Sequence, residues 1–382
     1  MAVLFLVFVT GLLTSPQAGA QVTALDFLRL VNSARANGMG GCVVTLVSEE
    51  SAYYNPGSVG LFHLDKVVSF VGPHRTKWFP ELADDLRLTS WSASVGGSSR
   101  MFRKPGQGRD NLSVGVAFSR TRMSYGTYTQ LDEIGNIVGE YEPFDAANCL
   151  AIGFGWERTV RIGLGYAIKL LHSDLGHPQV GRSADAVAHQ FGVLVEVPMY
   201  DLVKQDSSNE SLASDEAQIR VTPTIAYVLD NVGNGITYRE ATRTYKLPKM
   251  SRLGVSIRGA LASYRKEYCS LRGSVQIEKP YVGEHHRLAN LGLEAGALKS
   301  FFVRIGSTEV EGAKDNLFTW GLGFHLGGLF DWCGVRRCGE DGHGFRAYLA
   351  RHFDLAVDYA KWSKVEDNQW SNTWFYAVSL SF

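Results

Sequence analysis

The chain has 382 residues, of which 45% are hydrophobic, 12% aromatic and 20% charged, and its 38 basic residues balance its 38 acidic ones. Balanced charge argues against a nucleic-acid-binding protein, and this hydrophobic content argues against a disordered one. A mean hydropathy of −0.07 excludes a membrane protein built from many apolar helices, but it is compatible with a membrane β-barrel, in which alternate residues are polar.

An apolar run opens the chain from Ala2 to Leu13, and the small residues Ala18, Gly19 and Ala20 follow it. The run has the length of the hydrophobic part of a signal peptide and is too short to span a membrane, while Ala-Gly-Ala is typical of a cleavage site. We therefore predict that residues 1–20 are a signal peptide that is removed on export.

Residues 21–60 lack the two-residue alternation that is typical of strands. The apolar residues of Asp26 to Ala36 have helical spacing, and a stretch with Gly38, Gly40 and Gly41 follows. These glycines do not form a nucleotide-binding loop, because the Lys-Ser/Thr pair of that loop is missing. They favour a segment whose backbone packs closely against another part of the protein.

From residue 61 onward, large apolar residues alternate with small or polar ones, which is the period of a β-strand. In the last segment, Trp374, Tyr376, Val378, Leu380 and Phe382 share one face, opposite mostly small residues. Fourteen such segments are predicted, at residues 66–71, 86–95, 112–118, 150–156, 162–170, 190–197, 219–227, 253–262, 272–278, 290–294, 301–306, 318–326, 353–359 and 373–382.

The polar face of these segments is rich in Gly, Ala and Ser and poor in long charged side chains, as expected for a crowded lumen rather than for a surface in water. A membrane leaves backbone groups no water to bond with, so strands cross it only when their sheet closes. We therefore predict an all-β fold, a 14-stranded antiparallel transmembrane β-barrel, in preference to a soluble β-sandwich. The terminal aromatic residue, Phe382, resembles the signal that the barrel-insertion machinery of the outer membrane reads.

The connections between the segments test this prediction, since such barrels alternate short internal turns with long external loops. We predict internal turns at Glu157–Val160, Glu267–Ser270 and Leu298–Ser300, and external loops at Ser124–Phe144 and Asn231–Ser251. Two further internal connections, Tyr200–Gln218 and Asp331–Phe345, are longer than this rule predicts.

Five cysteines are present, an odd number that leaves at least one unpaired or joined to another chain. Cys333 and Cys338 lie in one polar segment with four residues between them. In an oxidising compartment we predict a disulfide between them, and the alternative is a zinc site that includes His343. Cys149 and Cys269 are predicted to be small apolar side chains.

At Tyr54-Asn55-Pro56-Gly57, after the segment Ala34–Val44, the sequence resembles the FadL-like outer-membrane barrels. This group includes long-chain fatty-acid transporters, aromatic-hydrocarbon channels and the PorV and PorQ proteins of one secretion system. Gly57 stands where the family more usually has Ala. Weaker similarities follow in family order at Leu253–Ser256, Asn290–Glu294 and Leu355–Ala360, and the PorV-like branch is the more similar one.

This resemblance implies a barrel formed by residues 61–382, with residues 21–60 as a plug in its lumen, and its plug motif comprises Gly38, Gly40, Gly41, Asn55, Pro56 and Gly57. In the transporters of the family, a hydrophobic ligand binds outside, passes beside the plug and leaves through the barrel wall. In the PorV-like branch the barrel docks a secreted or surface protein.

Several charged residues fall on the predicted lumen face: Arg161, Lys169, Arg220, Arg258, Arg272, Arg304, Glu196, Glu278, Glu294, Asp354 and Asp358. We expect most of them to pair with each other or with the plug. An arginine left without a carboxylate would bind the head group of a fatty acid through two hydrogen bonds, and Arg35, Arg258 and Arg304 are the candidates. Phe144, Trp78 and Phe79 are predicted to line the mouth of the lumen.

The chain is not predicted to be an enzyme, because it has no G-x-S-x-G nucleophile motif, and Glu284-His285-His286 has no spaced third ligand for a metal. No cofactor and no metal are predicted.

The predicted function is passive uptake of long-chain fatty acids or similar hydrophobic molecules across the outer membrane of a diderm bacterium, with lateral exit and with the external loops exposed at the cell surface. The predicted partners are this ligand, outer-membrane lipid and the barrel-insertion machinery, and the alternative function is a PorV-like docking barrel.

Overall fold

The computed structural model describes residues 23–78, 80, 85–102, 110–176, 183–199, 217–238, 243–263, 266–282, 286–311, 316–333, 352–363 and 372–382. The predicted signal peptide, residues 1–20, lies outside this part of the chain, as do Phe79 and Cys338. No helix in these ranges is long and apolar enough to cross a membrane.

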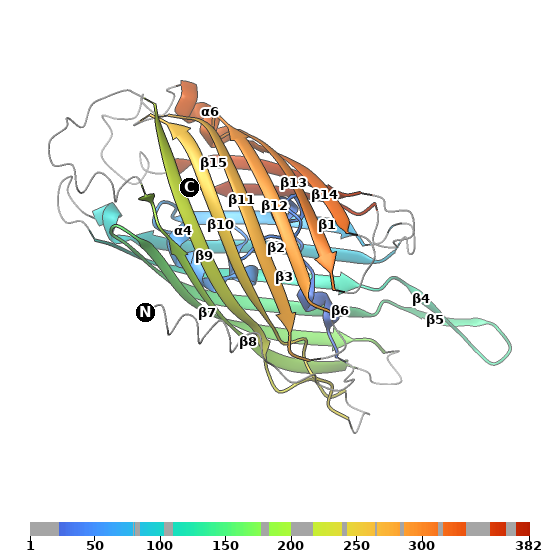
Figure 1. Cartoon of the computed structure of the whole chain (residues 1–382). Coiled ribbons are helices and arrows are strands. Elements are labelled where there is room, and N and C mark those ends of the chain that lie inside the picture. The colour runs from blue at the N-terminus through green and yellow to red at the C-terminus, as the bar shows by residue number, and fades with distance from the viewer. Residues whose placement is uncertain are drawn as a thin grey trace.

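Fourteen strands form one closed antiparallel barrel in which each strand pairs with the next along the chain and the last pairs with the first (Figure 1). The strands are β1 (Val68–Lys77), β2 (Arg87–Ser98), β3 (Asn111–Ser124), β6 (Phe144–Glu157), β7 (Arg161–Asp174), β8 (Ser183–Glu196), β9 (Gln218–Val232), β10 (Met250–Ala262), β11 (Glu267–Pro280), β12 (Leu288–Ala297), β13 (Phe301–Val310), β14 (Leu317–His325), β15 (Asp354–Trp362) and β16 (Trp374–Ser381). The predicted fold class and strand number are confirmed.

The strands place most of their large apolar side chains on the outside of the barrel. On β6, Leu150 and Phe154 are 51% and 55% exposed, whereas Cys149 and Ala151, on either side of Leu150, are buried. Burying apolar area away from water is the main force of folding, so a broad exposed belt of this kind suits contact with hydrocarbon. The inner face carries mostly small or polar residues and packs against the N-terminal segment.

The short connections gather at one end of the barrel, as predicted, at residues 158–160 and 298–300. The predicted turn at Glu267–Ser270 is wrong, because β11 already begins at Glu267 and the turn lies at 263–266. Cys269 and Ser270 are small, so the alternation of large apolar and polar residues does not extend to them. The sequence pattern therefore did not predict that the strand begins this early. The long connection after β14 begins with helix α6 (Leu326–Cys333), and a short 3₁₀ helix, η2 (Ser99–Phe102), follows β2.

The long connection between β3 and β6 lies at the opposite end and contains a second sheet. Its two strands, β4 (Tyr128–Leu131) and β5 (Ile137–Tyr141), form a hairpin that projects from the barrel, drawn at the right of Figure 1. The sequence predicted a long external loop here, and the hairpin within it was not anticipated.

The N-terminal segment from residue 23 to 64 lies inside the barrel and is largely buried. It contains η1 (Asp26–Arg29), α2 (Ala34–Gly38), α3 (Ser51–Tyr54) and α4 (Pro56–Phe62). Helix α2 packs on β13 to β16, and α4 packs on β3 and β6 to β8. The helix expected over Asp26–Ala36 is split into η1 and α2, because Ser33 adopts an extended conformation and caps α2 by accepting a hydrogen bond from the amide of Ala36. We refer to residues 23–64 as the plug.

Candidate functional site

The Asn-Pro-Gly motif forms the start of helix α4. The side chain of Asn55 accepts a hydrogen bond from the amide of Gly57 at 2.9 Å and donates one to the carbonyl of Val44 at 2.8 Å. Pro56 occupies the first helical position, where its missing N–H costs nothing. The motif therefore starts the helix and ties it to the preceding part of the plug.

Glycines on the inner wall let α4 touch the barrel backbone. A Cβ at Gly165 would lie 2.2 Å from the backbone of Pro56, and one at Gly163 would lie 2.1 Å from the carbonyl oxygen of Gly57. Gly57 has the same constraint, since its own Cβ would lie 2.7 Å from the carbonyl oxygen of Gly192. This contact explains why residue 57 is a glycine.

The glycine-rich stretch after α2 packs against β12 to β14. Gly40 has φ +64°, and a Cβ there would lie 2.5 Å from the carbonyl oxygen of Leu291. Its amide donates to the hydroxyl of Thr319 at 3.0 Å, and its carbonyl accepts from the hydroxyl of Thr308 at 2.8 Å. Close backbone packing, rather than ligand binding, accounts for this motif.

One ion-pair cluster joins α2 to the wall. Arg35 and Arg304 both bind the carboxylate of Glu294, at 2.7 and 2.8 Å, and Arg304 also pairs with Asp358. Glu294 and Arg304 are at most 5% exposed. The predicted ligand residues Arg35 and Arg304 are thus engaged by carboxylates of the protein itself, as was expected for most lumen charges.

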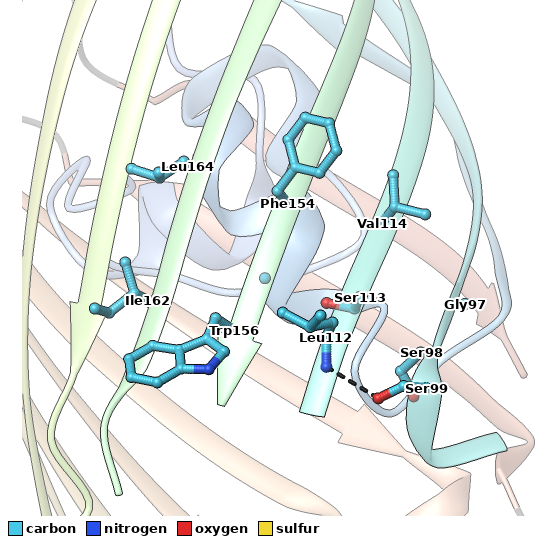
Figure 2. Close-up of a pocket in the computed structure, with 11 residues that line it drawn as sticks. Gly97, Ser98, Ser99, Leu112, Ser113, Val114, Phe154, Trp156, Ile162 and Leu164 are labelled. Atoms are coloured by element: carbon cyan, nitrogen blue, oxygen red, sulfur yellow. Dashed lines mark hydrogen bonds between the residues drawn. The ribbon is translucent and has the colours of Figure 1, made fainter. Parts of the chain in front are cut away.

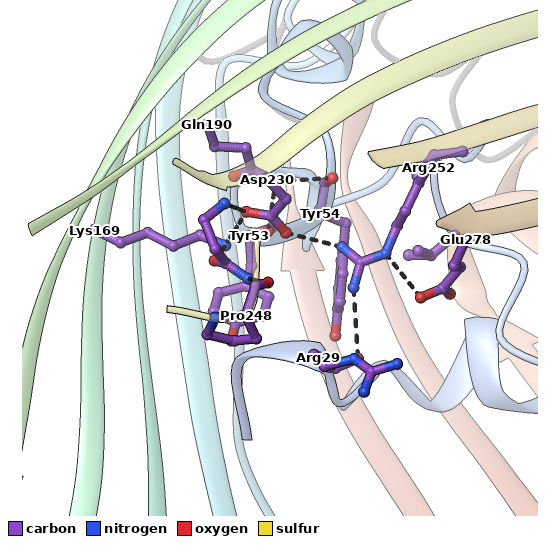
Figure 3. A network of polar contacts seen from close by, with 12 residues as sticks. Arg29, Tyr53, Tyr54, Lys169, Gln190, Asp230, Pro248, Arg252 and Glu278 are labelled. Atoms are coloured by element: carbon purple, nitrogen blue, oxygen red, sulfur yellow. Dashed lines mark hydrogen bonds and ion pairs between the residues drawn. The ribbon is translucent and has the colours of Figure 1, made fainter. Parts of the chain in front are cut away.

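A second cluster lies along β7 to β11 (Figure 3). Asp230 binds Lys169 at 2.6 Å and Arg252 at 2.9 Å, and Arg252 lies 3.3 Å from Glu278. The guanidinium of Arg252 also donates to the backbone carbonyl of Arg29 in the plug at 3.4 Å. The side chains of this cluster are buried, so the charges are matched within the protein and hold the plug against the wall.

Uncharged side chains of the wall complete these attachments. Gln276 accepts from the amides of Val43 and Val44, at 2.9 and 3.0 Å, and Gln190 donates to the carbonyls of Tyr53 and Tyr54. These side chains take the place of water as hydrogen-bond partners of the buried backbone amides and carbonyls of the plug. The plug therefore fills the lumen as an ordered structural element.

The other predicted ligand residues lie elsewhere. Arg258, on β10 near the short-turn end, forms an ion pair with Glu267. Phe144 shares its side of β6 with exposed Leu150, and its ring lies 4.2 Å from the guanidinium of Arg122. Phe144 thus faces outward, which corrects the expectation that it lines the mouth of the lumen.

Three aromatic residues fill the interior beside α2 at the long-loop end. The ring centres of Trp78 and Trp362 are 5.2 Å apart, and Phe375 lies 5.9 and 5.3 Å from them. The indole N–H of Trp362 donates to Asn37 of α2 at 3.1 Å. Trp78 was predicted near the mouth of the lumen. Trp362 and Phe375 were not predicted there, because they come next to Trp78 only when the barrel closes by pairing β1 with β16. We call this trio the aromatic cluster.

Among the described residues, β1 and β16 form the shortest strand pairing of the barrel wall, and backbone hydrogen bonds between Val68 and Phe382 extend it only toward the short-turn end. Their pairing comprises Ser69 with Ser381, Phe70 with Leu380 and Val71 with Ser379, all toward the short-turn end. Beyond Val71, β1 contains Gly72, with φ +106°, and Pro73, which has no amide to donate, and its register with β2 shifts before His74. We call the stretch beyond these three pairs the β1–β16 seam.

A small polar cavity of about 10 Å³, enough for roughly one water, lies behind the start of this seam. It is lined by Asn32, Glu50, Tyr53, Tyr54, Val71, His74, Ser90, Trp91, Ser92, Ser119 and Thr121. The carboxylate of Glu50 lies 3.5 Å from the ring of His74. Burial raises the pKa of Glu50 to about 7, so this plug residue changes charge near neutral pH.

A wide groove lies on the outside of the wall and does not connect to the lumen. Figure 2 shows this groove of about 710 Å³, lined mainly by outward apolar residues such as Leu112, Phe154 and Trp156. Behind it, β3 and β6 pair without interruption from Asn111–Glu157 to Ser124–Phe144. The groove is therefore part of the apolar belt and not a passage.

The cysteines and the candidate metal ligands add no site in the described residues. Cys42 and Cys149 are buried, Cys149 donates to the carbonyl of Ala52 at 3.5 Å, and Cys333 is exposed at the end of α6. Because Cys338 lies outside the described residues, the predicted disulfide stays a prediction. Within the part of the chain that the structure describes, no group of His, Cys, Asp and Glu is arranged to hold a metal ion.

Comparisons with known proteins found no matching family model and no matching curated protein. Among solved structures, the chain is similar to the toluene transporter TbuX of Ralstonia pickettii, with a TM-score of 0.45 and 10% identity over 91% of this chain and 96% of that one. It is also similar to the toluene transporter TodX of Pseudomonas putida, with a TM-score of 0.39 and 10% identity over 95% and 98% of the two chains. The fold assignment rests on the strand pairing described above.

Proposed function

We propose that the protein is an outer-membrane channel through which hydrophobic small molecules diffuse passively and leave sideways between β1 and β16. The exposed apolar belt supports the membrane location, because such a surface is compatible with hydrocarbon and costly in water. The short connections would then face the periplasm and the long ones the cell surface.

The filled lumen argues against a water-filled pore. Two ion-pair clusters and the amide contacts of Gln190 and Gln276 hold the plug across the barrel. A hydrophobic molecule that enters at the long-loop end first meets the aromatic cluster rather than an open polar channel. From there the nearest interruption of the wall is the seam beside Trp78 and Phe375.

The single observation that carries this proposal is the short pairing of β1 with β16, which ends at Val71 and Ser379. Barrel strands in a membrane are normally hydrogen-bonded along their whole length, since lipid offers no replacement partner. Parting β1 from β16 beyond these pairs therefore costs few backbone hydrogen bonds. A ligand leaving there enters hydrocarbon at once and does not cross water.

The ligand class is a long-chain fatty acid or a similar hydrophobic molecule. A carboxylate head group would compete with Glu294 for Arg35 and Arg304, so we propose that the apolar part of the ligand carries most of the recognition. Comparing uptake of a radiolabelled fatty acid with that of an aromatic hydrocarbon separates the two ligand types.

The experiment blocks the seam from inside the barrel. Ala377 faces the lumen on β16 and is 5% exposed, whereas its neighbour Val378 faces lipid and is 45% exposed. In a host without its own transporter, Ala377→Trp should reduce uptake about tenfold or more, as expected when a bulky ring obstructs a passage, while Val378→Trp should leave it unchanged. Equal uptake by both variants and the wild type, at equal amounts of folded barrel, would refute exit at this seam.

A further inference from the structure

The hairpin of β4 and β5 exposes large apolar side chains beyond the barrel. Ile134 is 84% exposed, Ile137 69%, Leu131 56%, Val138 55% and Tyr128 48%. These residues lie on a projecting sheet, well separated from the barrel strands that form the belt. Apolar side chains that are exposed together on one protrusion are typical of an interaction surface.

The hairpin is held in one conformation at both ends. At its tip, Asp132 accepts from the amides of Ile134 and Asn136, at 3.0 and 2.7 Å, and from the Asn136 side chain at 3.0 Å. The hydrogen bonds from Asn136, and to a smaller extent the one from the amide of Ile134, stabilise the carboxylate and hold the pKa of Asp132 below its usual range. At its base, the hydroxyl of Tyr125 donates to Asp145 of the barrel at 2.6 Å.

An isolated two-stranded sheet is marginal in water, and this one has no third strand beside it in the described residues. Tyr128 and Tyr141 stack across it with ring centres 5.7 Å apart, which adds some stability without covering either edge. An edge that is preformed and apolar is suited to accept a further strand.

The charge of the hairpin indicates which strand it accepts. Residues 125–143 contain the acidic residues Asp132, Glu133, Glu140 and Glu142 and no Lys, Arg or His. Glu142 pairs with Arg122 of the barrel at 3.6 Å, whereas Glu133 and Glu140 are exposed near the apolar residues. Negative charge of this kind disfavours the anionic head groups of a membrane surface and favours basic side chains.

We propose that the β4–β5 hairpin is a docking site for an extracellular protein, which adds an extended segment as a third strand, with apolar and basic residues two positions apart on one face. The register pairs Thr129 with Glu140 and Leu131 with Ile137, so Glu140 lies on the same face as Leu131 and Ile137. The apolar residues of the added segment cover Leu131 and Ile137, and its basic residues approach Glu140. This proposal takes from the proposed function only that the long loops face the cell exterior. The hairpin does not involve the β1–β16 seam, so a negative uptake result would leave the docking proposal intact, and a negative docking result would leave the channel proposal intact.

The test measures binding of a synthetic Lys-Val peptide, in which Lys and Val alternate at every second position with Thr between them, to the barrel in lipid nanodiscs. Ile137→Ser should weaken binding about tenfold or more, in the range of a binding hot spot, and Glu140→Lys should weaken it and reduce its dependence on salt. Leu175→Ser is the matched control, because Leu175 is an exposed apolar residue in another loop at the same end, 38% exposed.

Two altered peptides test the mode of binding. A peptide with Glu in place of Lys should bind at least tenfold more weakly, and so should a Lys-Val peptide methylated on alternate backbone amides, which keeps charge and apolarity but cannot form strand hydrogen bonds. Equal binding of either altered peptide would overturn the proposal, as would an equal effect of Leu175→Ser and Ile137→Ser. Far-ultraviolet circular dichroism and uptake should be unchanged in all three protein variants.

Discussion

The carboxylate of Glu294 joins the plug to the wall of the barrel. It lies 2.7 Å from the guanidinium of Arg35 in the plug, 2.8 Å from that of Arg304 and 3.9 Å from that of Arg272. With Asp358, the cluster has three positive and two negative groups. Glu294→Gln keeps the shape of the side chain but raises the net charge of the cluster from one positive charge to two.

Glu294→Gln should lower the free energy of unfolding because the cluster is buried: Arg304 is 1% and Glu294 5% exposed. Removing one partner of a buried ion pair typically costs about 3–5 kcal/mol, since the other charge stays buried without compensation. Gln retains one hydrogen-bond acceptor, so we expect a loss of about 3 kcal/mol in the free energy of unfolding. Adding Arg35→Met returns the net charge of the cluster to one positive charge and should recover about 1 kcal/mol or more.

The assay is urea unfolding of the detergent-solubilised barrel, followed by gel mobility with and without heating and by tryptophan fluorescence. Single-channel recording in planar bilayers adds a second measure, since a loosened plug should increase ion conductance. Glu309→Gln is the control, at an exposed position on β13, the strand that carries Arg304. The reasoning fails if Glu294→Gln loses less than about 1 kcal/mol, as a surface pair would, or if the double variant is less stable than the single one.

Three further predictions concern the plug. Gly57→Ala should destabilise the barrel by about 1–3 kcal/mol in the same urea assay, because the new Cβ would lie 2.7 Å from the carbonyl oxygen of Gly192; a neutral result would refute the clash. Asn55→Ala should cost about 1 kcal/mol or more, since it removes the α4 cap and leaves the carbonyl of Val44 without this donor, whereas Asn55→Asp should retain the cap. The raised pKa of Glu50 favours its protonated form in the folded state, so its contribution to stability is full below about pH 4.5 and is lost as pH rises through about 7. The change is at most about 3 kcal/mol, and Glu50→Gln should flatten this part of the pH profile; an unchanged profile would contradict the assignment.

The strand pattern could be predicted because it is local. Each crossing strand repeats its apolar and small residues with a period of two, as Leu150 to Trp156 does, and this period alone determines which residues face lipid. The number of strands, the antiparallel order and the end with long loops follow from counting such segments. The Asn-Pro-Gly motif likewise predicted a helix start, since Asn caps and Pro occupies the first turn through neighbouring backbone atoms.

Where individual side chains end up depended on contacts between distant parts of the chain. Arg35 and Arg304 were predicted to bind a ligand, but only the fold shows that both meet Glu294, which is 259 residues from Arg35. Phe144 was assigned to the lumen because it is aromatic and lies next to an external loop, whereas the register of β6 turns it outward.

The sequence by itself therefore determined the architecture, because alternation, caps and glycine spacing act within a few residues. The tertiary structure alone decided which lumen charges pair with each other, that the wall has its shortest pairing between β1 and β16, and that Trp362 and Phe375 join Trp78. Each of these features joins residues that are far apart in the chain, and neither periodicity nor composition specifies which distant strands close onto each other.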